Sequence, residues 1–125
     1  MLTNATLARM RSVAASLLRP GFAICNVTRT LDRFGRESVT YEEVASVRGL
    51  LENTSGTERA LLAAFTDDGV LRTETARLKL PHGTGVTTRQ VVRSPDGRYW
   101  DVAHINTDTM AAHTIALLIL REVDR

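Results

Sequence analysis

The sequence predicts a mainly β protein: a small antiparallel β-barrel of about six strands, with a helix at the N-terminus and a short helix or long loop inserted after the second strand. Short runs rich in Val, Ile, Thr and aromatic residues recur over residues 22–123, separated by Gly, Pro, Asn and Asp. One of these breaks, residues 94–97, reads Ser-Pro-Asp-Gly. Asp96 suits a turn position, and Gly97 takes the position that needs a positive φ, so we expect a tight hairpin here.

Length and composition indicate one globular domain. The chain has 125 residues, 43% of them hydrophobic and 24% charged, which is enough to bury a core without disulfides or a structural metal. We expect a single domain over residues 1–125, with the helix inside residues 1–20, the barrel over 22–123 and the insertion over 52–72. The one cysteine, Cys25, lies in an apolar run, and we expect it to be a buried, unreactive thiol.

Two features of the sequence bear on membranes and export. No apolar run reaches membrane-spanning length. The N-terminal arginines are interleaved with apolar residues, whereas a signal peptide places its charges first. We therefore expect a soluble protein that is made inside the cell and has no membrane partner.

The first three elements follow from local patterns. Residues 3–18 place Leu7, Met10 and Ala14 at helical spacing, and Pro20-Gly21 is expected to stop this helix. Residues 22–30 and 38–51 read as strands joined by a turn at 32–36, with Gly35 as its flexible point. Gly49, inside the second strand, indicates a bulge or a close approach of another backbone.

Residues 52–72 interrupt the β pattern. Ser55 and Glu58 have the spacing of a capping box, and the good helix formers of residues 59–65 follow. Asp67-Asp68-Gly69 is expected to end the helix, with Gly69 as a left-handed cap. The alternative is a mobile loop that becomes ordered on assembly. The apolar stripe of Leu61, Leu62 and Phe65 fits either a core contact or a partner contact.

The remaining strands are expected at residues 72–80, 86–93, 98–105 and 115–123. In the first of these, polar and apolar residues alternate. The third contains Trp100, the only tryptophan, which we expect to anchor the core. The last is apolar on both faces, which is typical of a central strand or of a strand at a subunit contact.

The sequence offers little for catalysis. His82, His104 and His113 have neither a second cysteine nor the helical spacing of zinc ligands, and no Gly-x-Ser-x-Gly elbow is present. The Gly-rich loop at 81–85 lacks both phosphate-binding fingerprints. We expect no enzyme activity, no metal and no cofactor, with the histidines structural or on the surface.

Charge is distributed in blocks. Residues 1–36 hold six arginines against one acid, Asp32, whereas residues 37–76 hold eight acids against three arginines. Such opposed blocks either pair between neighbouring subunits or form solvated faces. The net charge of +2 is too small to indicate nucleic-acid binding.

The order of several segments resembles the head–tail connector proteins of long-tailed phages, in the head-completion, adaptor or stopper group. The segments are Asp-Arg-Phe-Gly-Arg at 32–36, the run at 40–51, Ser-Gly-x-Glu at 55–58, a polar-alternating strand and Asp-Gly-Arg-Tyr-Trp-Asp-Val at 96–102. The resemblance covers about residues 22–123. Its fold landmarks in this chain are Gly35, Gly49, Asp96, Gly97 and Trp100.

The resemblance implies a structural virion protein of the phage neck. It implies a homo-oligomeric ring between a portal or adaptor protein on the head side and a tail terminator or tail tube on the tail side, with packaged double-stranded DNA passing through without sequence-specific binding. In stopper relatives a long loop projects into the channel, and here the matching segment is about Asn53 to Arg72. The helix-forming character of that segment departs from an extended plug. The candidate channel-facing or assembly residues are Glu52, Asn53, Glu58, Leu61, Leu62, Phe65, Asp67, Asp68 and Arg72.

Two alternatives stay open at this level. A tail-terminator or tail-completion protein also forms rings from small β folds. A monomeric β-barrel binding module, or a small hydrolase or toxin, is a different class of protein with no role in a particle.

Overall fold

A computed structural model describes residues 3–64, 66, 68–71, 73–106 and 113–121. Six antiparallel strands form a closed barrel in the order β1-β2-β3-β6-β5-β4, with one helix before the barrel and one after β2. The elements are α1 (Asn4–Ser16), β1 (Arg19–Leu31), β2 (Glu37–Glu52), α2 (Gly56–Ala63), β3 (Thr75–Pro81), β4 (Gln90–Arg93), β5 (Tyr99–Asn106) and β6 (His113–Leu120). The predicted fold class is confirmed, and the inserted segment contains a helix.

The interior of the barrel is filled by inward-facing side chains of all six strands, among them Phe22, Leu78, Val92, Trp100 and Leu118. Burial alternates along β3, as the sequence pattern predicts. Trp100 is 2% exposed, and its Nε1 donates a hydrogen bond to Ser94 Oγ at 3.1 Å. The tryptophan is therefore a core anchor with its one polar atom satisfied, as expected.

The two predicted glycine landmarks of the hairpins have the expected geometry. Gly97 has φ +85° in the turn between β4 and β5, where its N–H donates to the carbonyl of Ser94 at 2.9 Å. Gly35 has φ +78° in the turn between β1 and β2. There, Asp32 Oδ1 accepts from the backbone N–H groups of Phe34 and Arg36. Both turns therefore use local side-chain and backbone bonds to reverse the chain.

Several predicted boundaries are wrong. The N-terminal helix ends at Ser16, and Pro20-Gly21 lies inside β1, where pairing shifts by one residue between Arg19 and Phe22. The strand predicted at 86–93 is reduced to β4, because Thr87 and Gln90 close a turn through two hydrogen bonds. β6 begins at His113 rather than at residue 115. Residues 107–112, in the predicted connection, and 122–123 lie outside the described residues.

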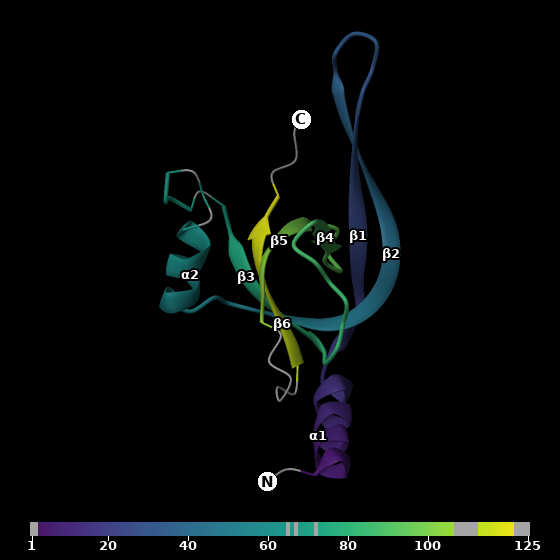
Figure 1. Ribbon diagram of the computed structural model, residues 1–125, viewed down its shortest axis with the longest axis vertical. Coiled ribbons are helices and arrows are strands. Elements are labelled where there is room, and N and C mark those ends of the chain that lie inside the picture. The colour runs from purple at the N-terminus through teal and green to yellow at the C-terminus, as the bar shows by residue number, and fades with distance from the viewer. Residues whose placement is uncertain (1–2, 65, 67, 72, 107–112, 122–125) are drawn as a thin grey trace.

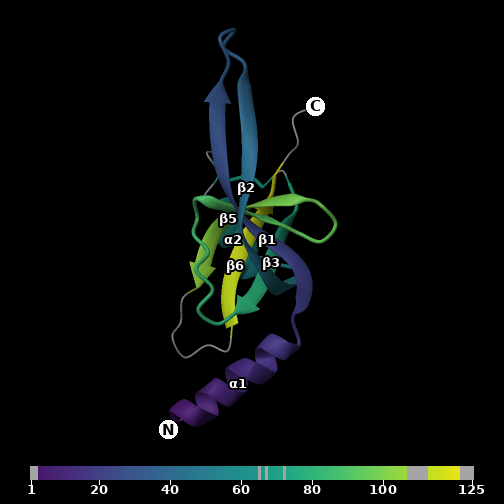
Figure 2. The ribbon, with the colours of Figure 1, turned by 90° about the vertical axis from the view of Figure 1, so that its right-hand side faces the viewer.

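The strands differ greatly in length, and this difference shapes the molecule. β1 and β2 have 13 and 16 residues, whereas the other four have between 4 and 8. β4 pairs with β1 only over Ala23–Asn26, and β3 pairs with β2 only over Leu50–Glu52. The far halves of β1 and β2 therefore leave the barrel as a two-stranded hairpin, which we call the arm (residues 27–41), standing clear of the other strands (Figures 1 and 2).

The two helices occupy different places on the barrel. α1 lies beyond the end of the barrel opposite the arm, and α2 lies on the side away from β1 and β2 (Figure 1). α2 packs against β6, and its Leu62 is fully buried. No helix among the described residues is both long and apolar enough to cross a membrane.

Candidate functional site

The arm carries the two most exposed large apolar side chains among the described residues. Leu31 and Phe34 at its tip are 72% and 76% exposed, and Val39 is also exposed. The other face of the same two strands carries Thr28, Thr30, Ser38 and Thr40. An apolar side chain exposed at a hairpin tip is costly in water unless another surface covers it, which makes the arm a candidate interaction surface.

A β-bulge sets the direction of the arm. Ile24 pairs with Ala45 but Cys25 pairs with Glu43, so Val44 is an extra residue on β2. A bulge bends its strand, and one extra residue moves the following side chains to the other face. Ala45 packs against the interior core, whereas Glu43 and Tyr41 lie on the outside of the barrel.

On the outside, Glu43 and Tyr41 meet side chains of β4 and β5. The rings of Tyr41 and Tyr99 stack with centroids 4.1 Å apart and planes 15° apart, and the guanidinium of Arg121 lies 5.5 Å from the Tyr41 ring. Arg93 Nη2 lies 3.3 Å from Glu43 Oε2. The pKa of Arg93 is raised, first by its hydrogen bond with Tyr99. These contacts fasten the base of the arm to the barrel.

Cys25 lies beneath this cluster. It is 1% exposed, and burial raises the pKa of its thiol, with Glu43 acting in the same direction and Arg93 opposing it. The thiolate, which is the reactive form, is therefore disfavoured. The expectation of a buried thiol is confirmed.

The predicted insertion has the capped helix that its sequence indicates. Ser55 Oγ accepts from the N–H of Glu58 at 3.1 Å, and Glu58 Oε1 accepts from the N–H of Ser55 at 2.9 Å. The helix ends earlier than predicted, with Ala64 as its C-cap in a right-handed conformation, so Gly69 does not cap it. The expected end at 67–69 is wrong because Ala64 already closes the last turn onto Ala60, Leu61 and Leu62.

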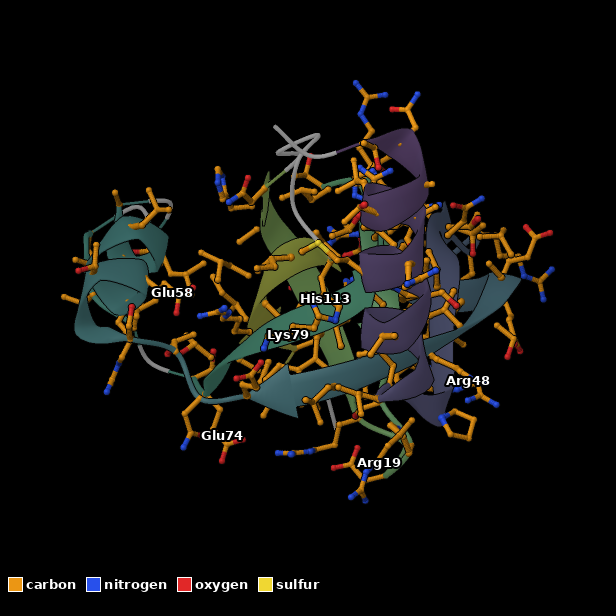
Figure 3. All side chains as sticks on the ribbon, turned by 90° about the horizontal axis from the view of Figure 1, so that it is seen from below. Arg19, Arg48, Glu58, Glu74, Lys79 and His113 are labelled. Carbon is orange, nitrogen blue, oxygen red and sulfur yellow. The ribbon has the colours of Figure 1, made fainter. Side chains whose placement is uncertain are left out.

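The candidate channel-facing residues lie in different environments: some are ion-paired, one is buried and others are exposed. Glu52 Oε1 lies 2.9 Å from Lys79 Nζ, and Glu58, on the side of α2 that faces the barrel, lies 3.9 Å from Arg77 Nε (Figure 3). Leu62 is buried in the chain's own fold, whereas Leu61, Asn53 and Asp68 are exposed. Phe65, Asp67 and Arg72 lie outside the described residues.

A cavity of about 710 Å³ opens beside this segment. Its walls come from the end of β2, the start of β3 and the β4–β5 turn, and they include Glu52, Arg59, Glu74, Arg98 and Trp100. Arg98 bonds Glu74 and Asp96, both at 2.7 Å, and lies over the Trp100 ring at 5.0 Å. Arg98 and Glu74 of this wall are thus engaged with each other.

The histidines are not gathered into one site. His82 follows β3, His104 lies on β5 and His113 begins β6, and all three are half-buried. Within the described ranges, no group of three or more His, Cys, Asp or Glu side chains is placed to hold a metal ion. Asp101, which precedes His104 on β5, has its Oδ1 3.3 Å from Arg121 Nη1.

The arm was missed as a candidate site by sequence reasoning, which pointed to residues 53–72. The available signal was the length of the β-rich run at 38–51, relative to the shorter runs that follow. Length alone does not show that neighbouring strands leave a pair uncovered.

Comparisons with known proteins bear on the fold. No family model matches the sequence, and no curated protein matches it. The solution structure of protein SF1141 from Shigella flexneri 2a is similar, with a TM-score of 0.57, 17% identity, and coverage of 82% of this chain and 92% of that one. A chain from the virion of a native gene transfer agent particle also matches, with a TM-score of 0.45, 16% identity and the same coverage. The first likeness shows a shared fold, and at these identities no function is transferred.

Proposed function

We propose that this chain is a structural subunit of a phage-like virion, which forms a homo-oligomeric ring in the neck between portal and tail and helps to close the DNA channel. The observation that carries the proposal is the arm: a hairpin that the barrel fastens at its base yet leaves uncovered along its length. An isolated two-stranded hairpin is marginally stable in water, so such an element suits a subunit that is completed by other chains.

A second exposed element lies at the other end of the molecule. In α1, Met10 and Val13 are exposed apolar residues, as is Leu17 just after the helix. The arm and α1 lie at opposite ends of the long axis (Figure 1). A connector needs contacts on both a head side and a tail side, and this arrangement supplies one docking element for each.

The insertion supports a passive conduit for DNA. Because Glu52 and Glu58 lie against cations of β3, this part of the surface offers DNA neither a strong anionic nor a strong cationic field. A channel through which DNA slides should avoid tight, salt-sensitive phosphate contacts. The channel-facing position of residues 53–72 remains a prediction. Reversing the charge of Glu52 and Asp68 together should add phosphate contacts and slow the passage of DNA through particles, and unchanged packaging and ejection would remove this part of the proposal.

Electron microscopy of particles that carry a small label on this chain tests the proposal. Label density confined to the neck, between portal and tail, is the expected result. Label on tails that are assembled separately from heads, at the tail end that joins the head, would favour the tail-terminator alternative instead. Particles without label would overturn the structural role and bring the binding-module and enzyme alternatives forward.

A further inference from the structure

The arm has two open strand edges. Inside the barrel every strand is paired on both sides, which removes exposed edges. Among the described residues, however, no third strand pairs with residues 27–31 of β1 or with residues 37–49 of β2. An open edge is a row of unpaired N–H and C=O groups and can accept another strand.

The turn at the arm's tip shows which backbone groups point outward. The N–H of Asp32 donates to the carbonyl of Arg36 at 2.9 Å, so this pair faces inward. Backbone groups in an antiparallel pair alternate between the partner and the open side. The outward groups are therefore those of residues 27, 29 and 31 on β1 and of residues 37, 39 and 41 on β2.

The two edges carry opposite charge. Arg29 is the only charged residue in 27–31 of β1, and Glu37 is the only charged residue in 37–41 of β2. Within the arm, Arg29 Nη1 already lies 3.5 Å from Glu37 Oε1. Contact between two β2 edges would place two Glu37 side chains on the same pair of strands, whereas contact between a β1 edge and a β2 edge places Arg29 beside Glu37. Opposite charges across a strand pair stabilise it and like charges destabilise it.

The faces of the arm also suit a continued sheet. Val27, Leu31, Val39 and Tyr41 share one face with the Arg29–Glu37 ion pair, and the opposite face is lined by Ser and Thr. If arms lie side by side with their strand directions preserved, the apolar side chains of neighbouring arms lie on the same face, around these ion pairs. This arrangement removes from water apolar surface that a single arm leaves exposed.

We infer that copies of this chain join arm to arm, with the outer edge of β1 in one copy paired antiparallel with the outer edge of β2 in the next. The contact uses two different surfaces of the same chain, so it is heterologous and repeats around a ring until the ring closes. This inference deepens the proposed function, because it rests on a ring and assigns the surface that builds it.

Two proline variants test the pairing. Arg29→Pro blocks the β1 edge and Val39→Pro blocks the β2 edge, and neither removes an N–H that bonds within the arm. In native mass spectrometry of the full chain, the wild type should form a closed oligomer and each variant alone should be monomeric. An equal mixture should form a heterodimer and nothing larger, because one intact β1 edge then meets one intact β2 edge.

Charge variants test the polarity of the contact without touching the backbone. Arg29→Glu should weaken association by about fivefold per contact, which corresponds to about 1 kcal/mol for a like-charge strand pair. Arg33→Glu is the matched control, since this substitution makes the same change of charge in the turn, beyond the strand edges. Equal weakening by both variants would overturn the assigned polarity.

The outcomes separate this inference from the proposed function. If the proline variants, with native near-ultraviolet circular dichroism, still form the wild-type oligomer, or if either dimerises alone, arm pairing is overturned while the neck role stands. A wild type that stays monomeric at its highest soluble concentration also overturns arm pairing. Absence of the labelled chain from the neck overturns the role, whatever the proline variants do.

Discussion

Tyr41 and Tyr99 stack ring on ring, although their strands, β2 and β5, are not neighbours in the barrel. Two strands, β1 and β4, lie between them in the barrel order. The contact is possible because the bulge at Val44 places Tyr41 on the outer face of the barrel, the face that also carries Tyr99. The stack therefore couples the direction of the arm to the wall of the barrel.

The first prediction concerns that coupling. Tyr41→Ala should release the base of the arm, with a loss of about 1 kcal/mol for the aromatic pair. Because the Tyr41 ring lies outside the interior core, the barrel should stay folded. Hydrogen exchange should quicken at the arm amides and stay slow in β3 and β6. Tyr41→Phe keeps the ring and is the control, so equal exchange in both variants would show that the stack does not hold the arm.

Trp100 is predicted to be the largest single contributor to the core. Trp100→Ala removes a 2% exposed ring and should lower the free energy of unfolding by about 3–5 kcal/mol. Chemical denaturation followed by circular dichroism measures this change. Ser94→Ala removes the acceptor of the indole N–H together with the bonds from the hydroxyl to Asp96 and to the Arg98 carbonyl, and should cost about 1–3 kcal/mol. An unchanged midpoint for Trp100→Ala would contradict the buried position.

Gly49 should not tolerate a side chain. A Cβ at this position would lie 2.9 Å from Leu78 Cδ1 and 3.3 Å from the backbone oxygen of Lys79. Gly49→Ala should therefore destabilise the barrel by about 1–3 kcal/mol through overpacking. Gly56→Ala is the matched control, since nothing lies within 4 Å of its Cβ and alanine is the better helix former. Thermal unfolding should show opposite shifts for the two variants, and shifts of the same sign would argue against the close approach.

Asp96 should make the stability depend on acid pH. Hydrogen bonding from Ser94 first, and then from Arg98, holds the pKa of Asp96 below its ordinary value of 3.8. A lowered pKa favours the folded state when the group is ionised, so this stabilisation is complete above that ordinary value and is lost as the pH falls through the folded pKa. Asp96 is exposed, so the contribution is small.

Two variants isolate this titration. Asp96→Asn replaces Asp-Gly by Asn-Gly, a pair that suits a tight turn equally well. This variant should lose less of its free energy of unfolding between neutral and acid pH than the wild type does. Ser94→Ala should raise the pKa of Asp96 toward 3.8, as read from its carboxyl carbon by nuclear magnetic resonance. If the pKa stays where it is in Ser94→Ala, the hydroxyl is not the main cause of the shift.

Much of the fold could be predicted from local patterns because its turns and caps are made locally. The capping box of Ser55 and Glu58 and the turn at Gly97 each close within a few residues, so the sequence nearby contains all the atoms involved. Helix ends and strand ends were less predictable. α2 ends at Ala63 because Ala64 closes its last turn, and β4 begins at Gln90 because Thr87 and Gln90 close a turn. Propensity, which favours helix and strand over the neighbouring residues, predicts neither end.

The two candidate surfaces, residues 53–72 and the arm, also differ in how far the sequence predicts them. Residues 53–72 drew attention because their composition breaks the β pattern, yet Leu62 is buried and Glu58 is held against β3. The arm drew none, because its residues look like ordinary strand residues. Its exposure depends on where β3 and β4 stop pairing with β2 and β1, and that is a property of strands distant in the sequence.

By itself the sequence determined that this protein is an antiparallel β-barrel with a capped inserted helix, a tryptophan-anchored core and a tight turn at 94–97. It determined these because alternation, propensity and turn chemistry act over a few residues. Only the tertiary structure decided that the two longest strands, β1 and β2, extend beyond the strands that pair with them. It also decided that one extra residue, Val44, places Tyr41 on the outer face of the barrel and not in its interior. Register is set by pairing between strands, and a shift of one residue there changes which face every later side chain occupies.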